Sequence, residues 1–263
     1  MPIKLTAVSR RRPGLTRAEY FRYIEHYHGT VARLERFKID KYIQNHVIDG
    51  AFGTLADDDH QNKIADRDGV VELYFSEFRD MLATLEPEGV TTSRANQDGR
   101  FFANERTNVL CMAEETELPV ANPRPKFNPG LGEPGVGGLK VMYFIMRKDD
   151  VYPNDYYKLW QKAHDEAMAA SPYAQEQIRK IVVSKRSRVN DNDAAARAHF
   201  KMVDPPVYDM FVSFWVDSIE QVGAFRQYVA ALQESPYEFA DWSQSFYLYV
   251  RTVRIIDDAP PKD

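Results

Sequence analysis

Strand-length apolar stretches and amphipathic helical stretches alternate along the chain in an order that occurs twice. In the first half the order is strand, helix, strand, strand, helix, strand, and the sequence TRAE forms a capping box that begins the first helix. The expected first-half strands are residues 3–11, 38–48, 69–75 and 105–112, and the expected helices run from Thr16 to about Glu35 and onward from about Ser76. The expected second-half strands are residues 139–147, 177–185, 208–216 and 246–256, with helices at 154–170 and 218–233.

The second half is a diverged repeat of the first. KLTAVSRR at 4–11 is similar to KVMYFIMR at 140–147, so residue 140 corresponds to residue 4, an offset of 136. The same offset aligns three pairs of residues in the expected first helix of each half: Tyr20 with Tyr156, Ile24 with Trp160 and His28 with His164. Two homologous halves are the simplest explanation of a constant offset.

Each predicted β-α-β-β-α-β unit is typical of the ferredoxin-like fold, a four-stranded antiparallel sheet with both helices on one face. The other face needs a cover, and two copies in one chain can cover each other. Residues 117–138 contain five prolines and five glycines, which favours an extended linker. We therefore expect an α+β protein with a first repeat at 1–116, the linker at 117–138, a second repeat at 139–257 and a tail at 258–263.

Composition excludes several classes of function. The chain of 263 residues is 44% hydrophobic with a net charge of −5, which favours a globular protein and disfavours nucleic acid or an anionic membrane as partner. A single cysteine, Cys111, allows no internal disulfide and no cysteine-based metal cluster, as in a reduced compartment. No apolar run approaches the length of a membrane span. We expect a cytoplasmic protein that binds a small molecule, and we leave a homodimer open.

The first predicted helix carries the histidine of greatest interest. His28 lies four residues after Ile24 and three before Val31, so a regular helix places it on the inward face. The same spacing predicts that Tyr20, Tyr27 and Leu34 share that face and that His26 points elsewhere. His28 is then either a core histidine that bonds a tyrosine or a carbonyl, or a general base beside a substrate.

Polar residues also interrupt two predicted strands. In KYIQNHVI, alternation puts Tyr42, Gln44, His46 and Ile48 on one face, which lines either a cavity or a solvent-facing edge. Glu72 interrupts the apolar run VVELYF, with Tyr74 as a neighbour on its face. A buried carboxylate needs a partner, so Glu72 either pairs with an arginine at 10–12 or forms an acid–base set with His28 or His46.

Three stretches together resemble the EthD-type branch of the dimeric α+β barrel proteins. They are KLTAVSRRRPGLTRAEYFRYIEHYHG, then KYIQNHVID, then DGVVELYFSEF, and they span most of residues 3–110. The second half is less similar, because His164-Asp165 replaces the family's His-Gly and KIVVSKR lacks the tyrosine and histidine. The resemblance implies two sheets fused as one barrel, with a cavity between sheet and helices in each half.

The resemblance also implies a class of function. The family includes enzymes that need no cofactor or metal and act on aromatic or polyketide-like molecules. By this analogy the chain is a lyase or dehydratase in which His28 or His46 moves a proton and Tyr42 or Glu72 polarises or protonates an oxygen. The residues expected to hold the substrate are Tyr20, Ile24, Tyr27 and Tyr74.

Three alternatives stay open at this stage. One is cofactor-free, anthrone-oxygenase-like oxygenation, and a second is a non-catalytic binding or accessory protein. A third is a haem protein with His164 as axial ligand. Because Ser213 replaces Glu72 in the second half and His46 has no equivalent there, we expect one chemical site, in the first half.

Overall fold

The computed structural model confirms the predicted order of the main elements and describes residues 3–35, 37–53, 67–85, 94–104, 109–123, 138–187, 198 and 206–257. The first half comprises β1 (Ile3–Ser9), α1 (Arg17–Arg22), the π-helix η1 (Tyr23–His28), α2 (Gly29–Glu35), β2 (Lys41–Phe52), β3 (Gly69–Phe75), α3 (Phe78–Leu85), α5 (Arg94–Gln97), α6 (Gly99–Phe102) and β4 (Val109–Leu118). The second half comprises β5 (Leu139–Arg147), α7 (Pro153–Ala169), α8 (Pro172–Gln177), β6 (Lys180–Arg186), β7 (Met210–Val216), η4 (Ile219–Gln221), α10 (Val222–Gln233) and β8 (Ala240–Asp257). Residues 124–137 of the expected linker and the expected tail at 258–263 lie outside the described residues.

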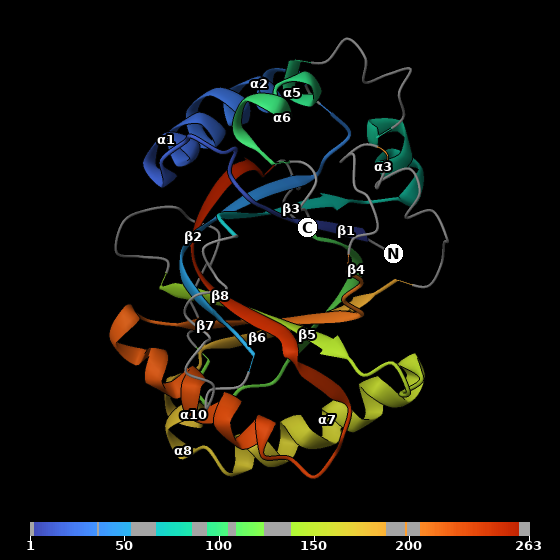
Figure 1. Cartoon of the computed structure of the whole chain (residues 1–263), viewed down its shortest axis with the longest axis vertical. Helices are drawn as coiled ribbons and strands as arrows, with labels where there is room; N and C mark the ends of the chain where they lie inside the picture. The colour runs from blue at the N-terminus through green and yellow to red at the C-terminus, as the bar shows by residue number, and fades with distance from the viewer. Residues whose placement is uncertain are drawn as a thin grey trace, which may run out of the picture.

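The strands form one closed barrel in the order β1-β3-β2-β8-β5-β7-β6-β4 (Figure 1). Each half supplies a four-stranded antiparallel sheet, and the two sheets are joined at their edges by the β2–β8 and β4–β6 ladders. The α+β class and the two fused ferredoxin-like repeats are therefore confirmed. Closure pairs the edge strands of each sheet and covers the inner face of both sheets at once.

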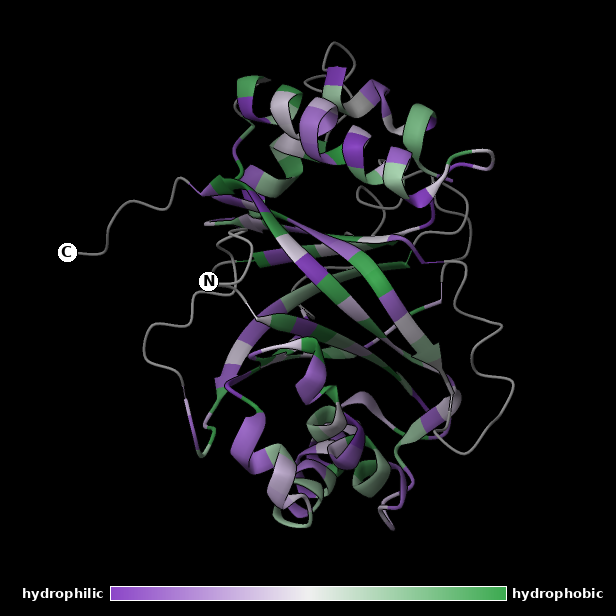
Figure 2. Cartoon of the chain, turned by 90° about the vertical axis from the view of Figure 1, so that its left-hand side faces the viewer, coloured by the Kyte–Doolittle hydropathy of each residue, from purple (hydrophilic) through white to green (hydrophobic). Residues whose placement is uncertain are grey.

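The helices cover the outside of the barrel in two layers, one over each half-sheet (Figures 1 and 2). This arrangement divides the apolar core into three clusters, because each strand sends alternate side chains inward and outward. One cluster lies under the first-half helices and includes Leu5 and Phe75, and a larger one lies under the second-half helices and includes Trp160. The third fills the barrel interior around Phe144 and Phe211.

The first helix contains a π turn that changes which residues face the sheet. Thr16 caps α1 with both bonds of the predicted capping box. Within η1 the chain is wider than in an α-helix, and the backbone N–H of Gly29 donates to the carbonyl of Ile24, five residues back. Inward positions therefore recur every four residues: Tyr20, Ile24, His28 and Ala32.

The expectation of a regular inward stripe is wrong for two residues because of this turn. Tyr27 is 51% exposed and Leu34 is 76% exposed. The ring of Tyr27 packs on Tyr23 at the surface, with centroids 5.0 Å apart. Tyr27 is thus not a residue that could hold a substrate under the helix.

Candidate functional site

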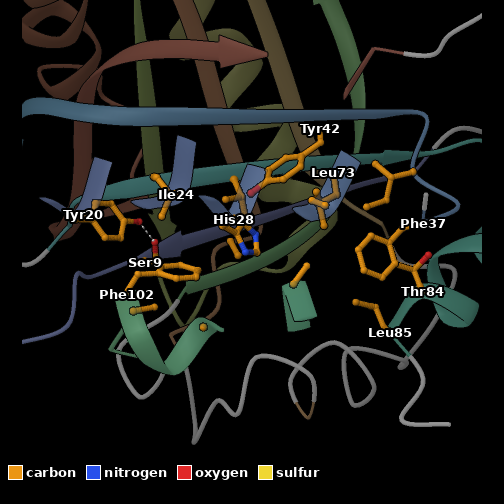
Figure 3. Close-up of a pocket in the computed structure, with 17 residues that line it drawn as sticks. Ser9, Tyr20, Ile24, His28, Phe37, Tyr42, Leu73, Thr84, Leu85 and Phe102 are labelled. Atoms are coloured by element: carbon orange, nitrogen blue, oxygen red, sulfur yellow. Dashed lines mark hydrogen bonds between the residues drawn. The ribbon is translucent and has the colours of Figure 1, made fainter. Parts of the chain in front are cut away.

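A cavity of about 130 Å³ lies between the outer face of the first-half sheet and the helices that cover it (Figure 3). The strands supply Ala7, Ser9, Tyr42, Val71 and Leu73 to its walls, and the helices and their connections supply Tyr20, Ile24, His28, Ala32, Phe37, Thr84, Leu85 and Phe102. Most of these side chains are apolar. A mainly apolar cavity with a few polar groups is the usual form of a small-molecule site.

His28 lies near the middle of the residues that line the cavity (Figure 3). It forms a dyad with Asp98, which is not itself a lining residue. The distance from His28 Nδ1 to Asp98 Oδ1 is 2.9 Å, and Asp98 is 4% exposed. An ionised carboxylate only accepts hydrogen bonds, so the neutral imidazole carries its hydrogen on Nδ1 and keeps the lone pair of Nε2 free. The rings of Phe102 and Tyr42 lie 5.1 and 6.1 Å from the imidazole, centroid to centroid.

Sequence reasoning did not identify Asp98. It is the single residue between the short helices α5 and α6, within the polar sequence NQDG, and lies 70 residues from His28 along the chain. The helix α5, which ends one residue before Asp98, packs against α2, and this contact brings the carboxylate beside the imidazole. No local pattern signals the partnership, because it depends on packing between segments distant in sequence.

Two tyrosines add hydroxyl groups to the cavity wall, beside those of Ser9 and Thr84. Tyr42 is buried, and its hydroxyl accepts a hydrogen bond from Gln44 Nε2 at 3.0 Å. The hydroxyl of Tyr20 lies 2.8 Å from Ser9 Oγ, and Gly69 makes room for it, because a Cβ at Gly69 would lie 3.2 Å from Tyr20 Cζ. Burial raises the pKa of both tyrosines, so both remain protonated near neutral pH.

His46 shares the strand face of Tyr42, as predicted, but the structure places it beside the cavity and not in its wall. Its ring stacks on Phe21 with centroids 4.5 Å apart. Its Nδ1 lies 2.9 Å from an Arg251 nitrogen, and its Nε2 lies 3.3 Å from Gln44 Oε1. Burial, with the charge of Arg251, lowers the pKa of His46 to about 3. Both ring nitrogens are therefore engaged by other side chains.

Glu72 and Tyr74 lie on the opposite face of the sheet, inside the barrel. Glu72 pairs with two lysines, Lys4 at 2.8 Å and Lys140 at 2.6 Å, and neither the arginine partner nor the histidine partner considered from the sequence is present. Burial would raise the pKa of Glu72, but the charges of Lys140 and Lys4 outweigh it and hold that pKa well below its usual range. Tyr74 donates to Glu115 at 3.2 Å. Neither residue lines the cavity.

The equivalent space in the second half is filled. Trp160 occupies the place of Ile24, and its indole stacks on His164 with centroids 5.0 Å apart. His164 Nδ1 lies 2.9 Å from the Tyr228 hydroxyl, and burial lowers the pKa of His164 to about 4. A haem at His164 would have to displace these two buried aromatic side chains, so the residues present do not fit a haem.

Two further observations concern metals and membranes. No group of three or more histidine, cysteine, aspartate or glutamate side chains in the described ranges is arranged to hold a metal ion. Within the same part of the chain, no helix combines the length and the apolar character required to cross a membrane.

Comparison with known families now adds to this geometry. Residues 12–105, which contain His28, Tyr42 and Asp98, match the EthD domain. An EthD domain is thus found within the first repeat, at residues 12–105. The match stops before the second repeat, where Trp160 fills the space beneath the helices. The dyad and most of the cavity wall thus lie within the matched residues, and Ala7 and Ser9 of β1 complete the wall from outside them.

No curated protein has a sequence match to this chain. A solved structure provisionally assigned as a chlorite dismutase has a TM-score of 0.50 at 12% identity and covers 95% of both chains. Chlorite dismutase from Candidatus Nitrospira defluvii, solved with imidazole, has a TM-score of 0.46 at 11% identity and covers 95% of this chain and 90% of its own. A provisionally assigned monooxygenase from Lactobacillus acidophilus has a TM-score of 0.42 at 10% identity, with 97% and 94% covered. At 12% identity the likeness to the first of these structures concerns the fold alone, and a fold hosts many activities.

Proposed function

We propose that the first repeat is a cofactor-independent acid–base enzyme of the lyase or dehydratase type. The observation that carries this proposal is the His28–Asp98 dyad at the wall of an apolar cavity. Asp98 holds the imidazole in one tautomer, and His28 Nε2 has no hydrogen-bond partner among the described residues. A neutral imidazole with a free nitrogen is the commonest general base near neutral pH.

The chemistry follows from two polar groups of the cavity wall, the imidazole of His28 and the hydroxyl of Tyr42. His28 Nε2 takes a proton from a carbon next to a carbonyl, and the C–H electrons move into the carbon–carbon bond of an enolate. In a dehydration, the enolate electrons re-form the carbonyl and expel a β-hydroxyl group, which leaves as water after taking the proton from His28. The elimination thus produces an enone and one water, and His28 returns to its neutral form.

The size of the cavity limits the substrate. Its volume of about 130 Å³ is close to that of engineered apolar cavities of roughly 150 Å³ that bind benzene. One six-membered ring therefore fits against Ile24, Leu73 and Phe102, with a polar substituent near His28 and Tyr42. We propose a hydrophobic substrate with an aromatic ring and a carbonyl group.

The test is hydrogen exchange into a simple model substrate. Acetophenone in D₂O is followed by NMR for loss of its methyl protons, and 4-hydroxy-4-phenylbutan-2-one is followed for formation of the enone. Wild-type protein should accelerate both reactions, and His28→Ala should lower the rate by about a hundredfold or more, the usual contribution of a general base. Asp98→Asn should also lower it, because an amide no longer selects the Nδ1–H tautomer.

Two variants serve as controls. His164→Ala removes the matching histidine of the second repeat, and His26→Ala removes an exposed imidazole on the same helix as His28. Both should keep the wild-type rate. Equal loss of rate from His28→Ala and His164→Ala would refute a single site, and oxygen uptake in step with substrate loss would favour an oxygenase. Tight binding of both compounds with no exchange would favour a binding protein.

A further inference from the structure

A chain of hydrogen bonds leads from the protein surface to the cavity wall. Arg251, 54% exposed, lies 2.9 Å from His46 Nδ1. His46 Nε2 lies 3.3 Å from Gln44 Oε1, and Gln44 Nε2 lies 3.0 Å from the Tyr42 hydroxyl and 2.6 Å from the carbonyl of Ile24. The first and last side chains come from β8 and β2, which join the two halves of the barrel.

The direction of donation along this chain is determined at both ends. The Ile24 carbonyl only accepts, so the Gln44 atom beside it is the NH₂ group and Oε1 faces His46. A guanidinium only donates, so His46 Nδ1 accepts from Arg251 and Nε2 carries the hydrogen given to Gln44 Oε1. Both ends thus require the same neutral tautomer of His46, which agrees with its pKa of about 3.

This direction leaves one donor without a protein acceptor. The two amide hydrogens of Gln44 go to the Ile24 carbonyl and to the Tyr42 oxygen. The hydrogen of the Tyr42 hydroxyl therefore has to go elsewhere, and no acceptor for it is present in the described part of the chain. The hydroxyl belongs to a side chain that lines the cavity, so a ligand oxygen there can accept this hydrogen.

We propose that Tyr42 donates a hydrogen bond to the substrate oxygen, and that Gln44, His46 and Arg251 are positioning residues that keep it in the donor role. The proposal rests on the proposed function and adds to it a substrate class: a ring compound whose carbonyl, enolate or phenolate oxygen points at Tyr42. With that oxygen at Tyr42, the carbon next to it faces His28, whose ring centroid is 6.1 Å from that of Tyr42. The donated hydrogen bond then stabilises the negative oxygen that forms when His28 removes the proton.

The second repeat lacks this chain. By the pairing with the neighbouring strand, Ile43 opposite Glu72 corresponds to Val182 opposite Ser213, so Ile181 stands in the place of Tyr42 and Lys185 in the place of His46. These residues cannot form the chain of hydrogen bonds from Arg251 through His46 and Gln44 to Tyr42, which we name the relay. The relay is confined to the repeat that has the cavity, as expected for a feature of the site.

The probe for this proposal is 4-nitrophenol, whose absorbance reports its own ionisation. The measured quantity is the pKa of the bound phenol, from absorbance titrations at saturating protein. Tyr42 should favour the bound phenolate, so the bound pKa should lie below that of free 4-nitrophenol. Tyr42→Phe should raise the bound pKa by about one unit or more, because a hydrogen bond to a charged group is worth roughly a tenfold change in affinity or more.

The positioning residues are tested with a matched pair at the surface. Arg251→Met removes the donor to His46. It should raise the pKa of bound 4-nitrophenol, as Tyr42→Phe does, but by a smaller amount. Glu25→Gln removes the 2.9 Å ion pair of Arg251 with Glu25 but keeps the donor to His46, and should change nothing. Unchanged phenol pKa in both Tyr42→Phe and Arg251→Met, or no binding of 4-nitrophenol to wild type, would overturn the proposal.

A second measurement needs no ligand. The ring nitrogen shifts of ¹⁵N-labelled His46 should report a neutral Nε2–H tautomer from about pH 5 to pH 8 in wild type, since burial opposes its protonation. An Nδ1–H tautomer or a proton gained near the ordinary histidine pKa would refute the relay. The two proposals fail separately. If the phenol pKa depends on Tyr42 but no hydrogen exchange occurs, the proposed enzyme activity is refuted and the proposed role of Tyr42 stands. If exchange depends on His28 but the phenol pKa is unchanged in the variants of Tyr42 and Arg251, the activity stands and the role of Tyr42 is refuted.

Discussion

At the scale of single residues, three histidines that each pack against an aromatic ring have different partners and therefore different roles. His28 has a carboxylate on one nitrogen and the cavity beside the other. His46 lies between an arginine and an amide, and His164 bonds a tyrosine under an indole. Only His28 keeps a nitrogen for chemistry, because the nitrogens of His46 are both engaged and His164 is enclosed by packed rings.

The buried state of His164 predicts a dependence of stability on pH. The folded-state pKa of about 4 lies below the ordinary value of 6.5, so the unfolded chain binds a proton at this residue while the folded chain does not. The resulting stability is complete above the ordinary pKa and is lost as pH falls toward 4. Between about pH 7.5 and pH 5 the loss should be about 2 kcal/mol.

Urea unfolding of wild type and His164→Phe at the two pH values tests this sign and size. The variant should lose about 2 kcal/mol less than wild type on acidification, since phenylalanine binds no proton in either state. His46 has a similarly lowered pKa and stays in both proteins, so some acid sensitivity should remain. Equal pH dependence in the two proteins would contradict the buried neutral state of His164.

At the scale of elements, the first helix of each repeat determines whether there is a cavity. Ile24 and Trp160 occupy equivalent positions, and both are buried against their sheets. The indole fills the space that the smaller isoleucine leaves open. The π turn keeps His28 on the side of this space and turns Tyr27 away from it. The smaller residue at position 24 and the π turn therefore distinguish the first repeat, which has a cavity, from the second, which has a packed core.

Exchanging these two residue types between the repeats is the corresponding prediction. Ile24→Trp should fill the first-half cavity and weaken 4-nitrophenol binding by more than tenfold, with little change in melting temperature. Trp160→Ile should leave phenol binding unchanged and cost about 2–4 kcal/mol, because it opens a cavity in a packed core. The measurements are phenol titrations and urea melts on both variants. Retained binding in Ile24→Trp would show that the phenol binds elsewhere.

At the scale of the whole molecule, a buried ion cluster joins the two repeats inside the barrel. Lys4 and Lys140 are equivalent residues of the two halves, and both bind Glu72 of the first half. The amide of Asn45 also donates to Glu72, at 2.7 Å. Ser213 occupies the position equivalent to Glu72 in the second half, so the Glu72 carboxylate pairs with the lysines of both halves. The Lys140–Glu72 pair therefore forms only when both sheets close into one barrel.

Removing the central carboxylate should destabilise the barrel as a unit. Glu72→Gln removes the carboxylate that pairs with the buried, charged Lys140, and should cost about 3–5 kcal/mol of unfolding free energy. Glu117→Gln, which breaks an ion pair with Lys180 at a carboxylate 63% exposed, should cost no more than about 1 kcal/mol. Chemical denaturation of both variants gives the comparison. A loss of similar size in the two would show that Glu72 does not hold the repeats together.

The sequence alone determined the α+β class, the two repeats, the order of their main elements and the strand face shared by Tyr42 and His46. These features follow from local rules: the period of apolar positions, a capping box and an alternating strand. The asymmetry between Glu72 and Ser213 could also be read from the repeat. His28 could be singled out, because the irregular turn happens to keep it on the inward face.

Tertiary structure decided which of these residues meet. Asp98 joins His28 through helix packing, Glu72 turns into the barrel toward a lysine of the other half, and Arg251 reaches His46 across the β2–β8 ladder. Each partnership links segments at least 68 residues apart, so no local pattern could reveal it. The exposure of Tyr27 has a local cause of a different kind, since a π turn has no reliable sequence signal and is stabilised by the packing on either side of it.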